Sequence, residues 1–191
     1  MKIELSDIYI HPTAIVETLS EINEGSKIWH FAHVRDHAKI GRNVIIGKSS
    51  YVDSHVIIGD NVKIQNLVSV YQGVTIESEV FVGPHVTFTN DLYPRAMGEW
   101  QIIPTLIQKG ASLGANSTII CGLTVGEYAL VAAGSVVTKD VPNHGFVAGN
   151  PARLKGYVCF CARKVADIDI PSGIHVINCS HCGKEVKLNI K

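Results

Sequence analysis

Aliphatic side chains recur at every sixth position along most of this chain. The series is unbroken from Ile10 to Phe88 and resumes, after an interruption, from Ile107 to Val137. An α-helix would repeat its apolar positions near every 3.6 residues and an ordinary two-faced strand at every second residue, so neither explains the pattern. A period of six held over this length indicates a repeat whose unit is one short strand and one corner.

A second pattern accompanies these anchor positions. Four residues after each anchor the side chain is small or β-branched wherever the repeat is intact, apart from Leu123. Glycine often follows the anchor directly, as at Gly47, Gly83 and Gly114, and we expect it there because a tight corner tolerates glycine at the least cost. Three units make a triangular coil, whose anchors stack on those of the next coil about 4.8 Å away. An ordinary β-sandwich would instead need hairpin turns at irregular spacing.

The repeat is interrupted between Phe88 and Ile107, so that about one coil's length of chain leaves the solenoid. The segment 89–106 contains prolines, a glycine and two large amphipathic side chains, Tyr93 and Trp100. A long loop in an otherwise regular solenoid costs conformational entropy, and such loops are usually functional. We therefore expect a functional loop, with a tolerated surface insertion as the alternative.

Composition restricts the function classes. Seventeen basic residues balance seventeen acidic ones, which leaves no electrostatic footprint for nucleic acid or an anionic membrane. No apolar run approaches the length of a membrane span, and the N-terminus, MKIELSDIYIHP, lacks the apolar segment of a signal peptide. We therefore expect a cytoplasmic protein with neither nucleic acid nor membrane as a partner.

The six-residue pattern resembles that of the hexapeptide-repeat acyltransferases over about residues 8–142. The resemblance implies an all-β fold, a left-handed parallel β-helix of hexapeptide repeats with a protruding loop and a small C-terminal hairpin. Its handedness comes from the family, because the period alone does not determine it and the general rule for parallel crossovers predicts a right-handed coil. Members of the family are homotrimers with active sites between subunits, so we expect a homotrimer here.

The segment 137–156, VTKDVPNHGFVAGNPARLKG, resembles the coenzyme A-binding end of these enzymes. The resemblance assigns Lys139, Asn150 and Arg153 to acetyl-CoA, and the two cations suit its phosphates. A purely structural role, in which prolines and glycines end the solenoid, is compatible with this assignment. The pantetheine arm needs a shallow groove between coils, and small residues supply one: Gly114, Ala115, Ala132 and Ala133.

A more specific resemblance is to the nucleotide-sugar 3-amino N-acetyltransferases. It implies transfer of the acetyl group of acetyl-CoA to a sugar 3-amino group, with UDP-2-acetamido-3-amino-2,3-dideoxyuronate of surface glycan biosynthesis as the preferred acceptor. Similar enzymes act on dTDP-linked 3-amino-3,6-dideoxyhexoses, which is the alternative. The matching stretches are KIWHFAHV (27–34), KIQNLVSVYQGV (63–74), FVGPHVTFTNDLYPRA (81–96) and GASLGANSTIICGLTVGEYALVAAGSVV (110–137).

The loop favours an amine over a hydroxyl as the acceptor. Family members that acetylate sugar hydroxyls carry a histidine as general base at the position of Tyr93 here. An alcohol needs such a base, whereas an amine needs only to lose one proton near neutral pH. Sugar O-acetylation is therefore the less favoured alternative, and it would require another histidine to serve as the base.

The resemblance also assigns residues to the site. Asn90 matches the polar residue beside the sugar amine, and His85 is a candidate base that competes with the departing CoA sulfur for the proton. A histidine that only packs or hydrogen-bonds is the alternative for His85. The substrate-binding candidates, to which His33 adds an option for a uronate carboxylate, are Arg35, Gln65, Asn66, Tyr93 and Arg95.

Residues 157–191 leave the hexad pattern and hold four of the five cysteines. A C-x-C pair is followed by a C-x-x-C pair within HVINCSHCGKEVKL, which is typical of a hairpin. We predict a structural zinc site, because a tetrahedral thiolate site organises a segment too short to fold on its own core. Disulfides in oxidised protein or a metal-free remnant of a zinc ribbon are alternatives, and His181 could replace one ligand. The predicted ligands are Cys159, Cys161, Cys179 and Cys182.

We therefore predict two parts, a β-helix acetyltransferase domain over residues 1–156 and a Cys-rich, zinc-ribbon-like tail over residues 157–191. Two other classes of protein are built on the same kind of β-helix. One is a γ-class carbonic anhydrase, which binds a metal on three histidines between subunits, and this chain has nine histidines. The CoA-like segment 137–156 argues against that class. The other is a non-catalytic assembly scaffold, which predicts no thermal shift with acetyl-CoA.

Overall fold

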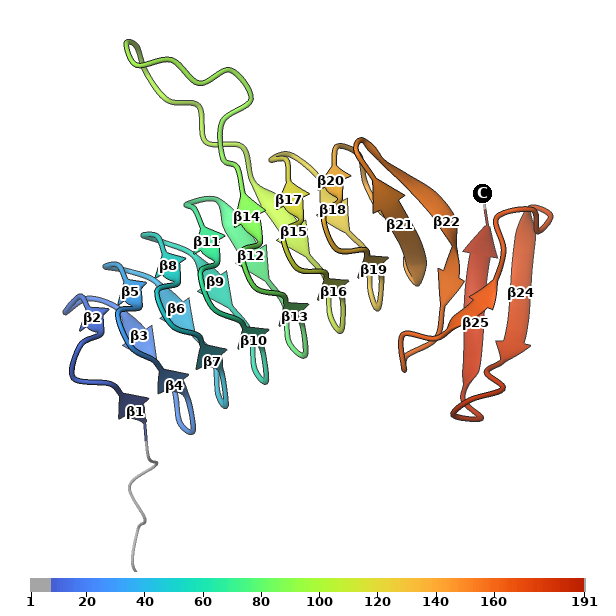
Figure 1. Ribbon diagram of the computed structural model, residues 1–191, viewed down its shortest axis with the longest axis horizontal. Helices are drawn as coiled ribbons and strands as arrows, with labels where there is room; N and C mark the ends of the chain where they lie inside the picture. The colour runs from blue at the N-terminus through green and yellow to red at the C-terminus, as the bar shows by residue number, and fades with distance from the viewer. Residues whose placement is uncertain (1–7, 191) are drawn as a thin grey trace, which may run out of the picture.

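The structure, a computed structural model that describes residues 8–190, is a solenoid of short strands (Figure 1). Strands eighteen residues apart pair in parallel, as Lys27 pairs with Ile45 and Ile45 with Lys63, so each turn stacks directly on the next. This confirms the predicted coil of three six-residue units. The first sheet holds β1 (Tyr9–Ile10), β4 (Lys27–Ile28), β7 (Ile45–Ile46), β10 (Lys63–Ile64), β13 (Phe81–Val82), β16 (Ser112–Leu113) and β19 (Leu130–Val131).

Two further sheets complete the triangular wall. The second holds β2 (Ile15–Val16), β5 (His33–Val34), β8 (Tyr51–Val52), β11 (Ser69–Val70), β14 (Thr87–Phe88), β17 (Thr118–Ile119) and β20 (Val136–Val137). The third holds β3 (Glu21–Ile22), β6 (Lys39–Ile40), β9 (Ile57–Ile58), β12 (Val74–Ile76), β15 (Thr105–Ile107) and β18 (Thr124–Val125). We call the turns from first to second sheet the first corner, those from second to third the second corner, and those from third back to first the third corner.

The core is built from the anchors and the small residues four positions later. Ile28, Ile46 and Ile64 are fully buried, as are the small Ala32 and Ala38. The first coil departs from this, since Ile10 is 43% exposed and, within residues 8–190, no further coil lies on its outer side. Burial of stacked aliphatic ladders is the main favourable term, so internal coils gain stability from both neighbours and the terminal coil from one.

Each corner turns at the third residue after the anchor. That residue has a left-handed backbone in coil after coil, with φ of 57° at Phe31, 59° at His85 and 58° at Asn116. The glycines directly after the anchors do not have positive φ, so the predicted reason for them is wrong. They are required by close approach instead, because a Cβ on Gly47 would lie 2.6 Å from the backbone of Gln65 in the next coil.

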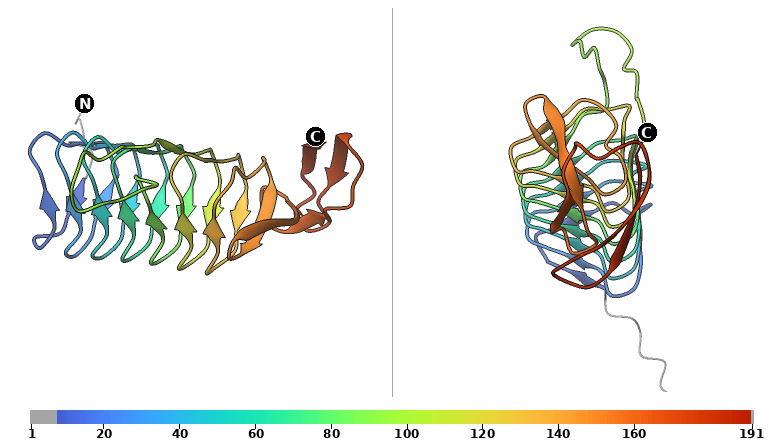
Figure 2. Two further views of the ribbon diagram at one scale, coloured as in Figure 1. Left: turned by 90° about the horizontal axis from the view of Figure 1, so that it is seen from above. Right: turned by 90° about the vertical axis from the view of Figure 1, so that its right-hand side faces the viewer.

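The interruption forms a loop that rises from the second corner, between β14 and β15 (Figures 1 and 2). Its bounds are 89–104, two residues shorter than predicted, because β15 begins at Thr105 and pairs in register with Val74 of β12. The Ile103 N–H donates to the Asn90 carbonyl at 2.9 Å and closes the base of the loop. The coil therefore resumes its register as though no residues had been inserted.

The C-terminal end replaces hexads with longer strands. In the first sheet β19 is followed by β21 (Gly145–Gly149), and then antiparallel by β22 (Ala152–Val158) and β23 (Lys164–Ala166). A separate hairpin follows, β24 (Gly173–Asn178) and β25 (Glu185–Ile190). The predicted boundary at residue 156 falls inside β22, and the two predicted parts begin and end at residues 1 and 191, outside the described range. Among residues 8–190 there is no helix long and apolar enough to cross a membrane.

Candidate functional site

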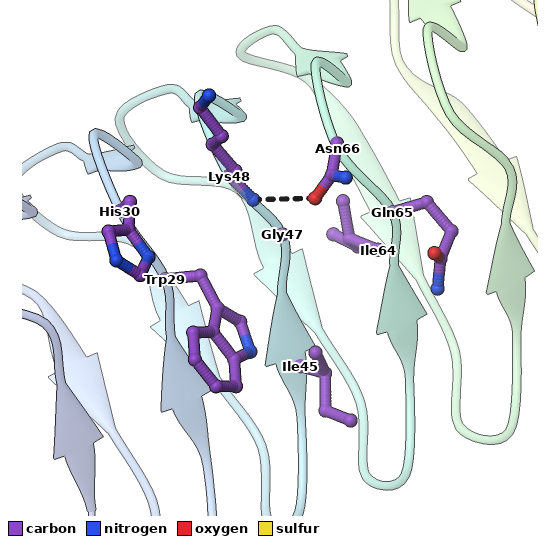
Figure 3. Close-up of a pocket in the computed structure, with 8 residues that line it drawn as sticks. All are labelled: Trp29, His30, Ile45, Gly47, Lys48, Ile64, Gln65 and Asn66. Atoms are coloured by element: carbon purple, nitrogen blue, oxygen red, sulfur yellow. Dashed lines mark hydrogen bonds between the residues drawn. The ribbon is translucent and has the colours of Figure 1, made fainter.

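A groove of about 230 Å³ runs along the first corner of the early coils (Figure 3). Its walls come from residues that stand eighteen apart and therefore stack in space. The Asn66 side-chain oxygen accepts a hydrogen bond from the Lys48 backbone N–H at 2.8 Å, which fixes that amide against the preceding coil. The polar lining residues are Trp29, His30, Lys48, Gln65 and Asn66.

The first corner continues towards the C-terminus as a row of small residues. The His85 N–H donates to the Asn66 carbonyl at 3.0 Å, and two coils on, the Gly134 N–H donates to the Ala115 carbonyl at 2.8 Å. These bonds link neighbouring coils along one edge. The structure thus brings together seven predicted site residues on this corner: Gln65, Asn66, His85, Gly114, Ala115, Ala132 and Ala133.

His85 occupies the left-handed position of its turn and its side chain is exposed. Within residues 8–190, its ring forms no hydrogen bond or ion pair. A histidine that acts as a general base is usually oriented by a second group. The surroundings of His85 in one chain therefore supply no orienting partner.

The predicted coenzyme A residues of the C-terminal end divide between two edges. The Gly149 N–H donates to the Ser135 hydroxyl at 3.2 Å, which brings Asn150 to the far end of the first corner. Arg153 is exposed and lies opposite Ala148 in the β21–β22 pair. Lys139, also exposed, follows β20 and so belongs to the second corner.

A polar ladder occupies the second corner of the early coils. The His33 Nε2 lies 2.8 Å and the Arg35 Nε 3.4 Å from the Glu17 carboxylate. The Arg35 Nη1 lies 3.5 Å from the Asp53 carboxylate, which also accepts the Tyr51 hydroxyl at 2.9 Å. The sequence-based candidates Arg35 and His33 are therefore already paired with anions of the same chain.

These contacts shift the titration of the ladder. The hydrogen bond from His33 lowers the pKa of Glu17 below its ordinary value, and the Asp36 N–H and Arg35 act in the same direction. The pKa of Arg35 is raised, first by its hydrogen bond with Tyr51 and then by the charges of Glu17 and Asp53. The guanidinium is thereby held charged.

The loop encloses a second hollow, of about 250 Å³, beside the second corner. Asn90 is half-buried at its base, and Arg95 and Trp100 line it. Tyr93 is 79% exposed and does not line this hollow. The structure thus brings Asn90 and Arg95 together and leaves Tyr93 on the outside of the loop.

The candidate residues of one chain therefore lie on two edges. His85 and the small-residue row are on the first corner, whereas Asn90 and the loop are on the second. Four residues, including the strand β14, lie between His85 and Asn90, so the two residues stand at opposite ends of that strand, roughly 15 Å apart at most. A single chain does not bring the small-residue groove and Asn90 to one place.

The four cysteines of the tail do come together. Their sulfur atoms all lie within 4.8 Å of one another. In the described part of the chain this is the one group of three or more histidines, cysteines and carboxylates placed to hold a metal ion. Within residues 8–190 the stacked pairs His11–His30 and His37–His55 belong to no such group, although the Asp36 carboxylate lies 3.8 Å from His37 Nε2.

Sequence reasoning missed the groove residues Trp29, His30 and Lys48, as well as the anions of the second corner. The signal was present as a spacing of eighteen, which stacks Trp29 on Gly47 and Gln65, and Glu17 on Arg35 and Asp53. Residues at this spacing share a corner whatever their chemistry. Reading the chain in blocks of eighteen would have found both sets.

Comparison with family models identifies the repeat. The model described as "Bacterial transferase hexapeptide (six repeats)" matches residues 20–54 and 55–90. A second, described as "Hexapeptide repeat of succinyl-transferase", matches residues 104–139. The matches stop on either side of the loop and before the C-terminal strands.

Curated proteins resemble the chain to different extents. A dTDP-3-amino-3,6-dideoxy-alpha-D-galactopyranose 3-N-acetyltransferase of Aneurinibacillus thermoaerophilus is 47% identical over 185 residues, 94% of this chain and 90% of that protein. Serine acetyltransferase 4 of Arabidopsis thaliana is 58% identical, but only over 27% of this chain and 15% of its own length. The first similarity includes the loop, the groove and most of the tail.

Solved structures share the solenoid. A hexapeptide-repeat acetyltransferase of Vibrio cholerae, complexed with acetyl coenzyme A, is 28% identical with a TM-score of 0.55, covering 62% of this chain and 69% of that one. A hexapeptide transferase family protein of Anaplasma phagocytophilum superimposes with a TM-score of 0.56 at 18% identity, covering 80% of this chain and 84% of its own. The second likeness concerns the fold alone.

Proposed function

The chain belongs to the hexapeptide-repeat acyltransferase family, and we propose that it transfers the acetyl group of acetyl-CoA to the 3-amino group of a nucleotide-linked sugar. The fold is accordingly the left-handed β-helix of that family. The observation that carries the proposal is 47% identity over 94% of the chain with a nucleotide-sugar 3-N-acetyltransferase. Similarity of that extent includes both the loop with Asn90 and the small-residue groove.

The proposed acceptor is a dTDP-linked 3-amino-3,6-dideoxyhexose, the alternative of the sequence analysis, rather than the UDP-linked uronate taken there as the preferred acceptor. The Aneurinibacillus thermoaerophilus relative, by its name, acts on a sugar of the first kind. The charges of the second corner support the same choice. Arg35 and His33, the candidates for a uronate carboxylate, are already paired with Glu17, and Arg35 also lies beside Asp53. A second carboxylate would have to compete with these anions.

Acetyl-CoA is proposed to lie along the first corner of the later coils. The Vibrio cholerae acetyltransferase, 28% identical, was solved with acetyl-CoA, and the strip formed here by Gly114, Ala115, Ala132 and Ala133 carries no large side chain that would obstruct an extended arm. Arg153 and Asn150 stand at the end of that strip, where a phosphate-bearing portion would extend. Arginine suits phosphate because its planar fork donates two hydrogen bonds at once.

The chemistry proposed is direct transfer in a ternary complex. The neutral 3-amino nitrogen attacks the thioester carbonyl, and a carbon–nitrogen bond forms as the carbon–sulfur bond breaks. The proton that the nitrogen loses goes either to the departing thiolate, which leaves as the thiol, or to His85. The Asn90 side-chain carbonyl orients the amine by accepting one of its hydrogens. Holding amine and thioester together supplies most of the rate in such a reaction.

We propose further that the active assembly is a homotrimer with sites between subunits. The groove and Asn90 occupy different corners of one triangular coil, roughly 15 Å apart along the chain. Packing the second corner of one copy beside the first corner of another would bring them together. The exposed Trp100 and Met97 of the loop, 71% and 87% exposed, are available to contact a neighbouring copy.

The test is a thiol-release assay with acetyl-CoA and four acceptors: dTDP- and UDP-linked 3-amino sugars, each as the 6-deoxy sugar and as the uronate. A dTDP-linked sugar with a 3-hydroxyl in place of the amine controls for O-acetylation. Turnover of the dTDP-linked 6-deoxy amine is expected. Turnover of a UDP-uronate alone would overturn the proposed acceptor and keep the chemistry, and no turnover with any amine would overturn the function.

A further inference from the structure

The four sulfur atoms of the tail gather at one place, all within 4.8 Å of one another. Cys159 Sγ lies 3.4 Å from Cys182 Sγ, and Cys161 Sγ lies 3.7 Å from Cys179 Sγ. A Zn²⁺ ion bound to four thiolates at about 2.3 Å holds its sulfurs about 3.8 Å apart, whereas a disulfide needs about 2.05 Å. The spacing of these thiols fits a shared ion and is too wide for two disulfides.

Two turns of similar construction present these thiols. In the β22–β23 turn the Cys159 N–H donates to the Arg163 carbonyl, and the Ala162 N–H donates to the Cys159 carbonyl at 2.8 Å. The β24–β25 turn has a similar pair of hydrogen bonds. The Cys179 N–H donates to the Lys184 carbonyl, and the Gly183 N–H donates to the Cys179 carbonyl, each at 2.9 Å. Ala162 and Gly183 both have left-handed backbones, with φ of 62° and 71°. Two hairpins thus each offer two sulfurs to one point.

The tail has little else to hold it together. Its own core contains five buried residues, two of them cysteines: Tyr157, Cys159, Cys179, Val186 and Leu188. The hairpin β24–β25 forms a separate two-stranded sheet with no strand paired to the solenoid. A two-stranded hairpin is marginal alone, and segments of this size usually need a metal or disulfides.

We propose that Cys159, Cys161, Cys179 and Cys182 bind one Zn²⁺ per chain in a closed tetrathiolate site that fastens the hairpin β24–β25 to the end of the β-helix. Four sulfurs fill the tetrahedral shell, so no position is left open for catalysis. Binding displaces the thiol protons to solvent and changes no oxidation state. His181 is exposed and outside the group of converging ligand atoms, so it is not needed as a ligand.

The same turn connects the metal site with the last coil. Phe160, between the first two cysteines, packs edge-on against Tyr128 at 4.6 Å and against His144 at 4.9 Å, both from the third corner. From the other turn, Lys184 Nζ lies 5.8 Å above the Phe160 ring. The His144 ring also hydrogen-bonds the Val158 carbonyl at 2.9 Å. Ordering of the cysteine turn therefore holds Phe160 as a cap on the solenoid.

The first test is metal content of the full chain purified under reducing conditions. About one zinc per chain is expected by elemental mass spectrometry, and Co²⁺ exchanged into the protein should give the visible absorption of a tetrahedral thiolate site. Metal content near zero with all five cysteines as free thiols would overturn the proposal. Metal-free protein with a mass lower by four hydrogens would replace the metal site with two disulfides.

Matched variants locate the site. Cys161→Ala and Cys182→Ala each remove one exposed thiol of the cluster and should lose most of the zinc. Cys121→Ala removes one buried thiol outside the cluster and should keep it. His181→Ala should also keep it. Zinc retained by both cluster variants, or lost equally from Cys121→Ala, would contradict the assigned ligands.

A further measurement tests whether the metal site holds the hairpin β24–β25 to the end of the β-helix. On adding a chelator, amide hydrogen exchange should accelerate in β24 and β25 and in the turn holding Phe160, while the internal coils stay protected. Exchange that is unchanged throughout, despite loss of the metal, would show that the site does not hold the hairpin. Because this readout is independent of acetyl transfer, it stands apart from the proposed activity.

Discussion

Gly114 lies directly against the backbone of Ala133 in the next coil. A Cβ on Gly114 would stand 2.4 Å from the Ala133 nitrogen, and the Gly114 N–H donates to the Val131 carbonyl at 2.8 Å. The two coils are in contact at the point where the acetyl-CoA groove is proposed. The groove floor is therefore set by backbone and leaves no room for a side chain.

Gly114→Ala should destabilise the protein by about 2 kcal/mol, because the added methyl group meets backbone that cannot move aside cheaply. Thermal denaturation should show the melting temperature falling by roughly 5 °C. Gly134→Ala is the control, since a Cβ there meets nothing within 4 Å although its φ is 69°. A larger loss from Gly134→Ala would mean that backbone conformation, and not close approach, decides these positions.

Asn90→Ala should lower kcat by about 100-fold, since the amine would lose the group that orients it. His85→Ala should keep most activity, because no second group orients the His85 ring as a base in the described chain. Steady-state kinetics on the preferred acceptor compares the two. The reverse order of losses would transfer the role of base to His85.

Mixed assemblies test whether the site is shared between copies. Ala133→Trp should block the groove and Asn90→Ala should remove the orienting amide, so each variant alone is nearly inactive. Chains co-refolded in equal amounts should regain about a quarter of the sites, because a quarter combine an intact groove with an intact Asn90 from the neighbour. A mixture as inactive as its parts would place both residues in a site of one chain.

Acid should selectively remove the contribution of Glu17 to stability. A carboxyl whose pKa is lowered on folding stabilises the fold above its unfolded pKa, and this is lost as the pH falls through its folded pKa. Glu17→Gln should therefore melt lower than wild type near neutral pH, with the difference shrinking below about pH 4. Melting curves across that range measure it.

Glu21→Gln is the control for this prediction. Glu21 forms a surface ion pair with Lys39 at 3.5 Å, both side chains being largely exposed, and such pairs contribute little. Its melting temperature should follow wild type at every pH. A pH-independent deficit in Glu17→Gln would indicate that the amide disturbs packing rather than removing a charge.

The solenoid could be predicted from sequence because one rule, a buried apolar residue at every sixth position, sets its strands from β1 to β20. Ile28, Ile46 and Ile64 are buried for the same geometric reason, and no long-range information is needed to place them. The four cysteines were found because thiols two or three residues apart have few other uses. These features depend on spacing alone.

The site was harder to predict because its contacts join residues eighteen apart. The linear sequence gives no sign that Arg35 is paired, yet the carboxylates of Glu17 and Asp53 lie within 3.5 Å of its guanidinium in the structure. The division of His85 and Asn90 between two corners also follows from position within the coil, which a linear motif does not express. The proposed acceptor rests instead on a relative whose similarity spans both the loop and the groove.

The loop 89–104 leaves the solenoid and rejoins it in register, with Val74 opposite Thr105 and Ile76 opposite Ile107. The strand register of the solenoid is therefore independent of the length and composition of the loop. The solenoid and the loop behave as separable modules, one determined by periodicity and the other free to diverge. A graft of this segment between relatives could exchange sugar preference while leaving every coil, and the folding of every coil, as it was.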